Sequence, residues 1–227
     1  MRRIWLSRLE LTHKRCILQL RNNIGRGARG HGFMKFIRRI CVYCGSSGRV
    51  DERYRTAATR LGGTLAKAGI ELVYGGGRVG LMGLVADAAL AAGGRVTGII
   101  PSHLHDREVG HTGLSELQIV DNMHERKRRM FELSDAFAAL PGGLGTLDET
   151  IEMITWKQLG LHDKPVVIID VAGYWTPLIE LIEHAVASGF AARSAFQLYR
   201  VVSRVEDLLP TLAAAPEPAL VPEPKLV

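Results

Sequence analysis

Long apolar runs are absent from this sequence, and cysteine is scarce. No apolar run reaches the roughly 18 residues that a membrane-spanning helix needs, so we expect no membrane span. Only three cysteines are present, Cys16, Cys41 and Cys44. They are too few for a disulfide framework and suit a reducing compartment, so a cytoplasmic location is expected.

The usual patterns of a metal site and of a serine nucleophile are missing as well. Cys41 and Cys44 have the spacing of half a zinc site, but no second pair accompanies them, which favours structural thiols. His103, His105 and His111 lie in one segment without a carboxylate ligand pattern. No serine occurs in a nucleophile-elbow motif. We therefore expect neither a metal ion nor a serine nucleophile.

Positive charge is concentrated at the amino end of the chain. The 227 residues carry a net charge of +6. Residues 1–33 contain eight Lys or Arg and one acid, which gives +7, so the remainder carries −1. Because a nucleic-acid-binding protein carries positive charge on its folded surface, we expect no nucleic-acid partner. Residues 1–33 are predicted to be a basic extension, disordered or translated from an upstream start, and residues 216–227 a Pro/Glu-rich tail.

Residues 34–215 alternate short apolar segments with amphipathic segments of helical period. Near-continuous apolar strands between such helices indicate a doubly wound, mostly parallel α/β sheet with helices on both faces (Rossmann-like), in a single domain. Ligands of this fold bind beyond the carboxyl ends of the strands, where three glycine loops of this sequence fall. Strands are predicted over residues 40–43, 70–74, 96–100, 117–120, 136–140, 165–170 and 198–203. Helices are predicted over 51–68, 81–92, 123–133, 175–188 and 204–214, with another ending at 159, and a polar loop over 101–116.

The run Leu-Pro-Gly-Gly-Leu-Gly-Thr-Leu-Asp-Glu at residues 140–149 links a predicted strand to a helix. Unpaired N–H groups and the helix dipole favour an anion at a helix start, and glycine lets the backbone approach it closely. We predict a phosphate at residues 143–146, with Glu149 one turn into the helix. An alternative role for Glu149 is purely structural. Thr146-x-x-Glu149 matches a capping box, in which the glutamate accepts a hydrogen bond from a backbone N–H at the helix start.

A second glycine run, Gly-Gly-Gly-Arg-Val-Gly at residues 75–80, matches G-x-G-x-x-G between a strand and a helix. Dinucleotide binding also requires an acid near the end of the next strand, for a ribose hydroxyl. That strand ends at Ile100, Pro101 and Ser102 without an acid. The run is therefore interpreted as a second wall of a mononucleotide site, with a bare tight turn as the alternative.

The basic segment at residues 121–131 has the period of a helix. Met123, Arg126 and Met130 share one helical face, so Arg126 points partly into the protein. An unpaired buried charge is unfavourable, so Arg126 is expected to need an anion. Arg128 and Arg129 are predicted to be solvated, and the pattern leaves Lys127 ambiguous.

Taken together, these motifs resemble the LONELY GUY family, the cytokinin riboside 5′-monophosphate phosphoribohydrolases. The family has often been labelled lysine decarboxylase, but nothing here indicates a pyridoxal-phosphate lysine site. The resemblance implies hydrolysis of the N-glycosidic bond of an N6-modified adenosine 5′-monophosphate, without a cofactor, by a homodimer whose site lies near the subunit interface. The matches follow the family's order over about residues 38–205: Cys-Gly-Ser-Ser at 44–47, Tyr-Gly-Gly-Gly at 74–77, Gly-Leu-Met-Gly at 80–83, Met-His-Glu-Arg-Lys at 123–127, Pro-Gly-Gly-x-Gly-Thr-x-x-Glu at 141–149 and Thr-Trp-x-Gln-Leu-Gly at 155–160.

The resemblance also implies roles for particular residues. Arg126 and Glu149 match the catalytic pair. The implied substrate-binding positions are Glu108, Lys127, Gly142, Gly143, Leu144, Gly145, Thr146, Leu147, Asp148 and Thr155. Further pocket positions are Ser46, Gly76, Gly77 and Met82.

The chemistry of the implied reaction agrees with this assignment. Breaking a nucleosidic bond builds oxocarbenium-like positive charge on the ribose, as glycoside hydrolysis does. A carboxylate beside C1′ stabilises that charge or activates the attacking water. The sequence leaves open whether Glu149 is nucleophile or base, and whether the released base is a cytokinin or adenine. The alternative function is a non-catalytic nucleotide or molybdenum-cofactor carrier on the same fold.

Overall fold

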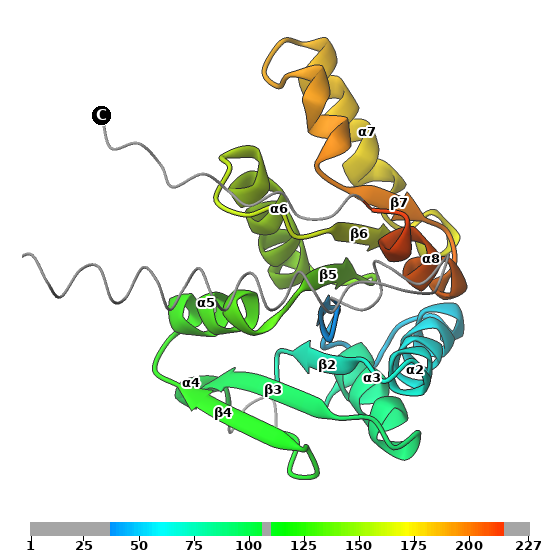
Figure 1. Ribbon diagram of the computed structural model, residues 1–227, viewed down its shortest axis with the longest axis vertical. Helices are drawn as coiled ribbons and strands as arrows, with labels where there is room; N and C mark the ends of the chain where they lie inside the picture. The colour runs from blue at the N-terminus through cyan, green and yellow to red at the C-terminus, as the bar shows by residue number, and fades with distance from the viewer. Residues whose placement is uncertain (1–36, 106–109, 216–227) are drawn as a thin grey trace, which may run out of the picture. The chain divides into compact units, whose positions relative to one another are not determined.

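The computed structural model describes residues 37–105 and 110–215, which build a seven-stranded sheet. All seven strands are parallel, in the order β4-β3-β2-β1-β5-β6-β7 (Figure 1). This arrangement confirms the predicted doubly wound parallel α/β fold. The strands are β1 (Arg39–Tyr43), β2 (Glu71–Tyr74), β3 (Val96–Pro101), β4 (Glu116–Val120), β5 (Ala136–Ala139), β6 (Val166–Ile169) and β7 (Arg200–Val202).

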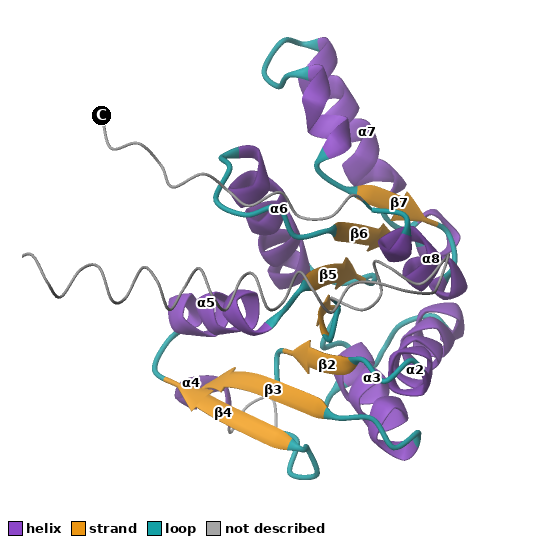
Figure 2. Ribbon diagram, in the orientation of Figure 1, coloured by secondary structure: helices purple, strands orange, loops and turns teal. Residues whose placement is uncertain are grey.

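Helices cover both faces of this sheet (Figure 2). Helices α2, α3 and α8 pack on one face, and α5, α6 and α7 on the other. No helix in the described ranges is long and apolar enough to cross a membrane. The helices are α2 (Glu52–Lys67), α3 (Gly80–Ala91), α4 (Ser102–His105), α5 (Met123–Leu133), α6 (Leu144–Gln158), α7 (Thr176–Ala187) and α8 (Leu208–Ala213), with 3-10 turns at Val171–Gly173, Arg193–Gln197 and Val205–Asp207.

Strand β1 shows why the inner strands are apolar throughout. Successive side chains of a strand point to opposite faces, and here both faces are covered. Ile40 and Val42 enter the core beneath α2 and α3, whereas Cys41 and Tyr43 enter the core beneath α5 and α6. The sheet therefore holds two separate hydrophobic cores that share its strands.

The chain reverses its direction of travel across the sheet at β1. Strands β2, β3 and β4 follow on one side of β1, and β5 then pairs on the other side. The loops that leave the carboxyl ends of β1 and β5 therefore run to opposite faces and open a crevice between them. This switch point is where a doubly wound sheet binds its ligand.

Two predictions about local structure need correction or remain open. The predicted polar loop at residues 101–116 contains α4, and its last residue begins β4. The predicted basic extension, residues 1–33, and the predicted tail, residues 216–227, lie outside the described residues, so this division of the chain stays a prediction.

Close packing between α2 and α3 gives a prediction about stability. A Cβ at Gly62 would lie 2.1 Å from the carbonyl oxygen of Val85, whereas a Cβ at the neighbouring Gly63 would meet nothing within 4 Å. We expect Gly62→Ala to destabilise the fold by about 1–3 kcal/mol, because the helices must separate. Gly63→Ala should instead stabilise it by about 0.5–1 kcal/mol, since alanine favours the helix. Urea unfolding of both variants measures the difference, and equal shifts would contradict the packing described.

Candidate functional site

A cavity of about 230 Å³ opens at the switch point, at the carboxyl edge of the sheet. A larger cavity of about 540 Å³ lies among Arg38, Arg95 and Asp135, which flank the amino ends of the strands. We assign the site to the smaller cavity, because loops from both sides of the switch point converge on it. Its lining residues are Cys44, Gly45, Ser46, Met82, Met123, Arg126, Gly143, Leu144, Gly145, Thr146, Asp148 and Glu149.

The loops after β1 and β5 are held together through the backbone of Gly45. Its N–H donates to the Pro141 carbonyl at 3.1 Å, and its carbonyl accepts from the Leu81 N–H at 2.9 Å. Gly142 makes this contact feasible, because a Cβ there would lie 2.1 Å from Thr146 Oγ1 and 2.8 Å from Gly45 N. One wall of the cavity therefore depends on a glycine that the sequence motif supplies.

Helix α6 begins at Leu144, with Gly143 as its N-cap residue. The first N–H groups of a helix have no partner within it, and Gly143 offers no capping side chain. The residues that carry these groups, Leu144, Gly145 and Thr146, all line the cavity. The start of α6 thus presents backbone donors and positive dipole potential to the cavity, as an anion site requires.

This helix start shows that the capping-box interpretation of Glu149 is wrong. A capping box needs Thr146 at the N-cap position, but Thr146 is the third residue inside α6. Glu149 therefore lies too far along the helix to serve the first N–H groups. It is 9% exposed and lines the cavity.

Arg126 enters the same cavity from α5 and is only 6% exposed. Its Nε donates to the Ile99 carbonyl at 3.1 Å, and Nη2 donates to the Gly75 carbonyl at 2.9 Å. Nη1 lies 3.8 Å from Met123 Sδ. The sequence predicted an anion as the partner of Arg126. In the structure, two neutral backbone carbonyls accept hydrogen bonds from its guanidinium, which remains charged.

Two charged residues of the cavity, Glu149 and Arg126, affect the pKa of Cys44. Burial raises the pKa of its thiol, and the Glu149 carboxylate raises this pKa further. Arg126 lowers the pKa but does not offset these effects. Cys44 is therefore a neutral, apolar part of the cavity wall rather than a nucleophile.

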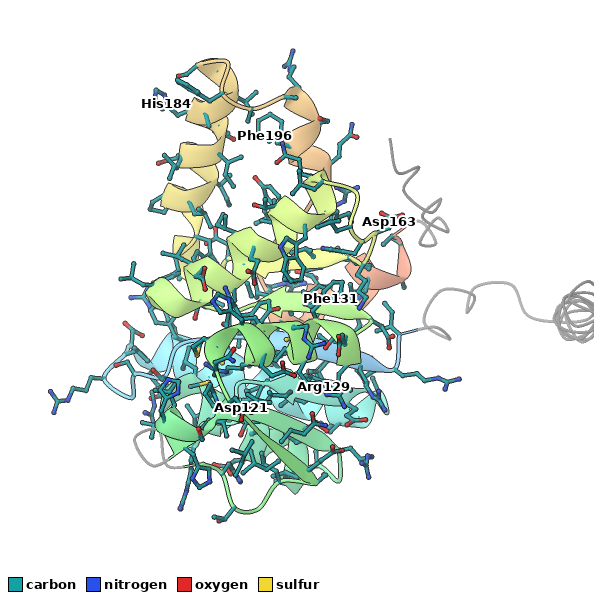
Figure 3. The ribbon with its side chains drawn as sticks, turned by 90° about the vertical axis from the view of Figure 1, so that its left-hand side faces the viewer. Asp121, Arg129, Phe131, Asp163, His184 and Phe196 are labelled. Carbon is teal, nitrogen blue, oxygen red and sulfur yellow. The ribbon has the colours of Figure 1, made fainter. Side chains whose placement is uncertain are left out.

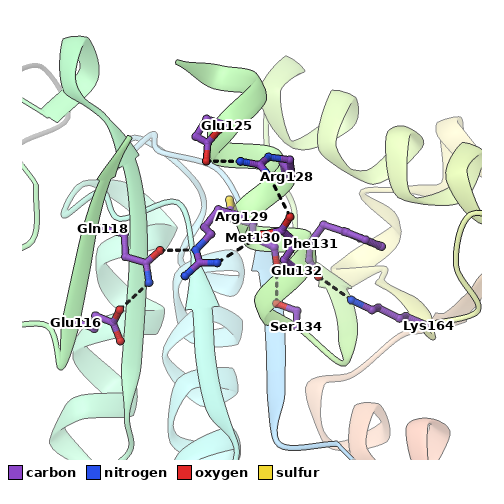
Figure 4. Close-up of polar contacts among 10 residues, drawn as sticks. All are labelled: Glu116, Gln118, Glu125, Arg128, Arg129, Met130, Phe131, Glu132, Ser134 and Lys164. Atoms are coloured by element: carbon purple, nitrogen blue, oxygen red, sulfur yellow. Dashed lines mark hydrogen bonds and ion pairs between the residues drawn. The ribbon is translucent and has the colours of Figure 1, made fainter. Parts of the chain in front are cut away.

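The other Lys and Arg residues of α5 are not among those that line the cavity. Lys127 Nζ lies 3.0 Å from Asp148 Oδ2 and 3.0 Å from Glu152 Oε1, so it joins α5 to α6. Arg128 pairs with Glu125 and Glu132 on the exposed surface, and Arg129 contacts Gln118 and Glu132 (Figure 4). Arg128 is exposed, as predicted, whereas Arg129 is partly buried.

Some of the predicted site residues line the cavity, and others do not. Thr155 is exposed further along α6, and Leu147 packs partly into the core beneath that helix. Glu108 lies outside the described residues. Those that line the cavity are Arg126, Glu149, Ser46, Met82, Gly143, Leu144, Gly145, Thr146 and Asp148. Those that do not are Lys127, Gly142, Leu147, Thr155, Gly76 and Gly77.

Cys44, Gly45 and Met123 line the cavity but were absent from the predicted site. The sequence held a signal for each of them. Cys44 and Gly45 directly follow the first predicted strand, and Met123 shares a helical face with Arg126. A further contact had no sequence signal, because Tyr174 donates from a distant segment to the Gly142 carbonyl at 2.6 Å. Within the described ranges, no group of three or more His, Cys, Asp or Glu residues could hold a metal ion.

Comparisons with known sequences give close relatives over most of the chain. The family described as "Possible lysine decarboxylase" matches residues 82–212. The chain is 46% identical over 180 residues to the cytokinin riboside 5′-monophosphate phosphoribohydrolase LOG of Oryza sativa subsp. japonica, covering 76% of this chain and 74% of that protein. It is 45% identical over 180 residues to LOG1 of Arabidopsis thaliana, which has the same enzyme name, covering 76% and 84%.

Solved structures show the same fold at lower sequence identity. The molybdenum cofactor carrier protein of Chlamydomonas reinhardtii is 22% identical with a TM-score of 0.59, covering 78% of this chain and 98% of that chain. The molybdenum cofactor binding protein of Rippkaea orientalis is also 22% identical with a TM-score of 0.59, covering 77% and 94%. Identity this low shows the fold alone, whereas the sequence relatives identify the family. The chain belongs to the LONELY GUY family of cytokinin riboside 5′-monophosphate phosphoribohydrolases.

Proposed function

We propose that this protein hydrolyses the N-glycosidic bond of an adenosine 5′-monophosphate, N6-modified or plain, to the free base and ribose 5-phosphate. The observation that carries the proposal is one cavity lined by Arg126, Glu149 and the open amino end of α6. An anion site, a carboxylate and a buried cation are the groups that this reaction needs. The names of the two enzymes that are 46% and 45% identical to this chain over 180 residues support the same reaction.

In the proposed mechanism, the backbone N–H groups at the start of α6 bind the 5′-phosphate. The bound phosphate places the ribose beside Glu149, whose carboxylate stabilises the positive charge that develops at C1′. One such electrostatic contact is typically worth about 3 kcal/mol of transition-state stabilisation. Arg126 keeps its charge and its orientation, and it binds the phosphate or holds Glu149 in register.

A base-release assay tests the proposal. The purified chain is incubated with isopentenyladenosine 5′-monophosphate, AMP and the two corresponding nucleosides, and released base is measured by liquid chromatography. We expect base from at least one monophosphate and much slower release from its nucleoside, because phosphate binding supports the reacting centre. A nucleotide carrier would instead bind a monophosphate without releasing base, and that result would overturn the proposal.

We also propose that a second copy of this chain covers an apolar face of α6. This α6 face consists of Leu144, Ile151, Thr155 and Leu159, which helical periodicity places on one side. Leu144 is 85% exposed and Leu159 67%, and Leu144 also lines the cavity. A partner on this face would close the cavity and bring its own Thr155 near it. Nucleic acid is not proposed as a partner.

Helix α7 has an apolar surface of the same kind. None of its residues is buried, and Leu181 is 62% exposed. In Figure 3, His184 on α7 and Phe196 lie at one end of the described residues, away from Asp121 and Arg129. Leu181 and Phe190, which follows the helix and is 90% exposed, are further apolar side chains that a partner would cover.

A pair of substitutions tests the proposed dimer. We expect Leu159→Glu to shift the protein from dimer to monomer in light scattering coupled to gel filtration, because a buried charge without a partner disfavours the interface. Glu52→Gln, an exposed change on α2, which packs on the opposite face of the sheet from α6 and α7, serves as the control and should leave the mass unchanged. A wild-type protein that elutes as a monomer would contradict the proposal.

A further inference from the structure

The glycine run after β2 does not line the cavity, although its sequence resembles a phosphate loop. Its first residue, Gly75, follows directly on the last residue of β2 and touches Arg126 instead. The Gly75 carbonyl accepts from Nη2 at 2.9 Å, and the Ile99 carbonyl on the neighbouring strand β3 accepts from Nε at 3.1 Å. The guanidinium therefore spans the carboxyl ends of two adjacent strands.

Gly75 also provides the space that this arrangement needs. A Cβ at this position would lie 2.0 Å from Arg126 Nη2 and 3.0 Å from its Cζ. The backbone of Gly75 is not in the left-handed region, unlike that of Gly76, whose φ is +77°. Alanine would thus suit the backbone at residue 75, and the arginine side chain is what excludes it.

The glycine run is fixed from its other side, so it cannot easily retreat from a larger side chain. The Gly76 carbonyl accepts from the His111 N–H at 3.1 Å, and Gly77 forms a bridge with Gly110. His111 is itself held, with Nε2 2.8 Å from Asp87 Oδ1. A Cβ at residue 75 would therefore displace Arg126 rather than the loop.

We propose that Gly75 is a positioning residue for Arg126, so that the glycine run after β2 serves the arginine and not a nucleotide phosphate. The Gly75 and Ile99 carbonyls use two of the five guanidinium N–H donors, and a third donor, on Nη1, is directed at Met123 Sδ at 3.8 Å. The two bonds fix the plane of the guanidinium before substrate arrives. This inference rests on the proposed function for its effect on catalysis, but the steric contact does not depend on it.

Activity of a Gly75→Ala variant gives the first test. We expect kcat to fall by about 100-fold, because a displacement of about 1 Å in a catalytic group has an effect of that size. KM should change much less, since the proposed phosphate site at the start of α6 is untouched. Gly48→Ala is the matched control, because a Cβ there meets nothing within 4 Å and Gly48 does not line the cavity. Wild-type kcat in Gly75→Ala would overturn the proposal.

A double-mutant cycle with Arg126→Ala gives the second test and does not require activity. Gly75→Ala should lower the melting temperature of the otherwise wild-type chain, yet have little effect once Arg126→Ala has removed the guanidinium. A Gly75→Ala variant that fails to fold but is rescued by Arg126→Ala would also support the proposal. Equal losses of stability in both backgrounds would overturn it. If no variant and no wild-type protein releases base, the proposed function fails while this stability cycle still decides the role of Gly75.

Discussion

Replacing Glu149 by glutamine is expected to abolish base release while leaving nucleotide binding nearly unchanged. Glutamine has the shape of glutamate but not its charge, so it cannot stabilise the positive charge that develops on the ribose. Loss of one such contact lowers kcat by about two to three orders of magnitude. The capping-box alternative no longer competes, because α6 begins five residues before Glu149.

Two measurements on Glu149→Gln separate catalysis from binding. Liquid chromatography gives the rate of base release, and calorimetry gives the affinity for AMP or for ribose 5-phosphate. Glu180→Gln makes the same chemical change at an exposed position on α7 and should keep full activity. Normal turnover by Glu149→Gln would remove this residue from the reaction, and a loss of affinity equal to the loss of rate would make it a binding residue.

Replacing Arg126 by methionine is expected to reduce both activity and stability. The substitution removes the buried cation of the cavity and leaves the Gly75 and Ile99 carbonyls without their donors. Two buried acceptors that lose their partners should lower the free energy of unfolding by about 2–4 kcal/mol. Activity should fall at least about 100-fold, because the charge that orients Glu149 or the phosphate is lost.

Variants with other side chains show which property of Arg126 matters. Arg126→Lys keeps the charge, but an ammonium lacks the planar fork that reaches two carbonyls at once, so most of the activity should still be lost. Arg128→Met is the control, since the ion pairs of Arg128 with Glu125 and Glu132 lie on the exposed surface and contribute little to stability. Base release and urea unfolding are measured for all three variants. Full activity in Arg126→Lys would show that charge alone suffices.

Much of the fold was predictable because its cause is local. Strands covered on both faces must be apolar throughout, and amphipathic helices between them leave few arrangements other than a doubly wound parallel sheet. The edge strand β4 is only partly buried, and its first residue lay inside the predicted polar loop. Helix α6 begins before the Thr146 N-cap that the capping-box alternative requires, and its first turn includes Gly145, a weak helix former whose propensity does not predict that start.

The site was predictable in its residues but not in its contacts. Arg126 could be recognised as partly buried from its helical face, yet no sequence pattern shows that backbone carbonyls from β2 and β3 receive it. Carbonyl groups are the same at every residue, so they leave no trace in the sequence. Lys127 was ambiguous for another reason: its partners Asp148 and Glu152 lie on α6, and the helical period of α5 does not show which residues of another helix it meets.

The two sides of the switch point contribute different kinds of residue to the site. All groups with a proposed role in the reaction lie in one continuous segment of the chain, which runs from α5 through β5 to α6. Cys44, Ser46 and Met82 come from the other side of the crevice and contribute walls rather than reacting groups. We therefore expect substitutions in these walls to change the preferred base while Arg126, Glu149 and the start of α6 stay in place.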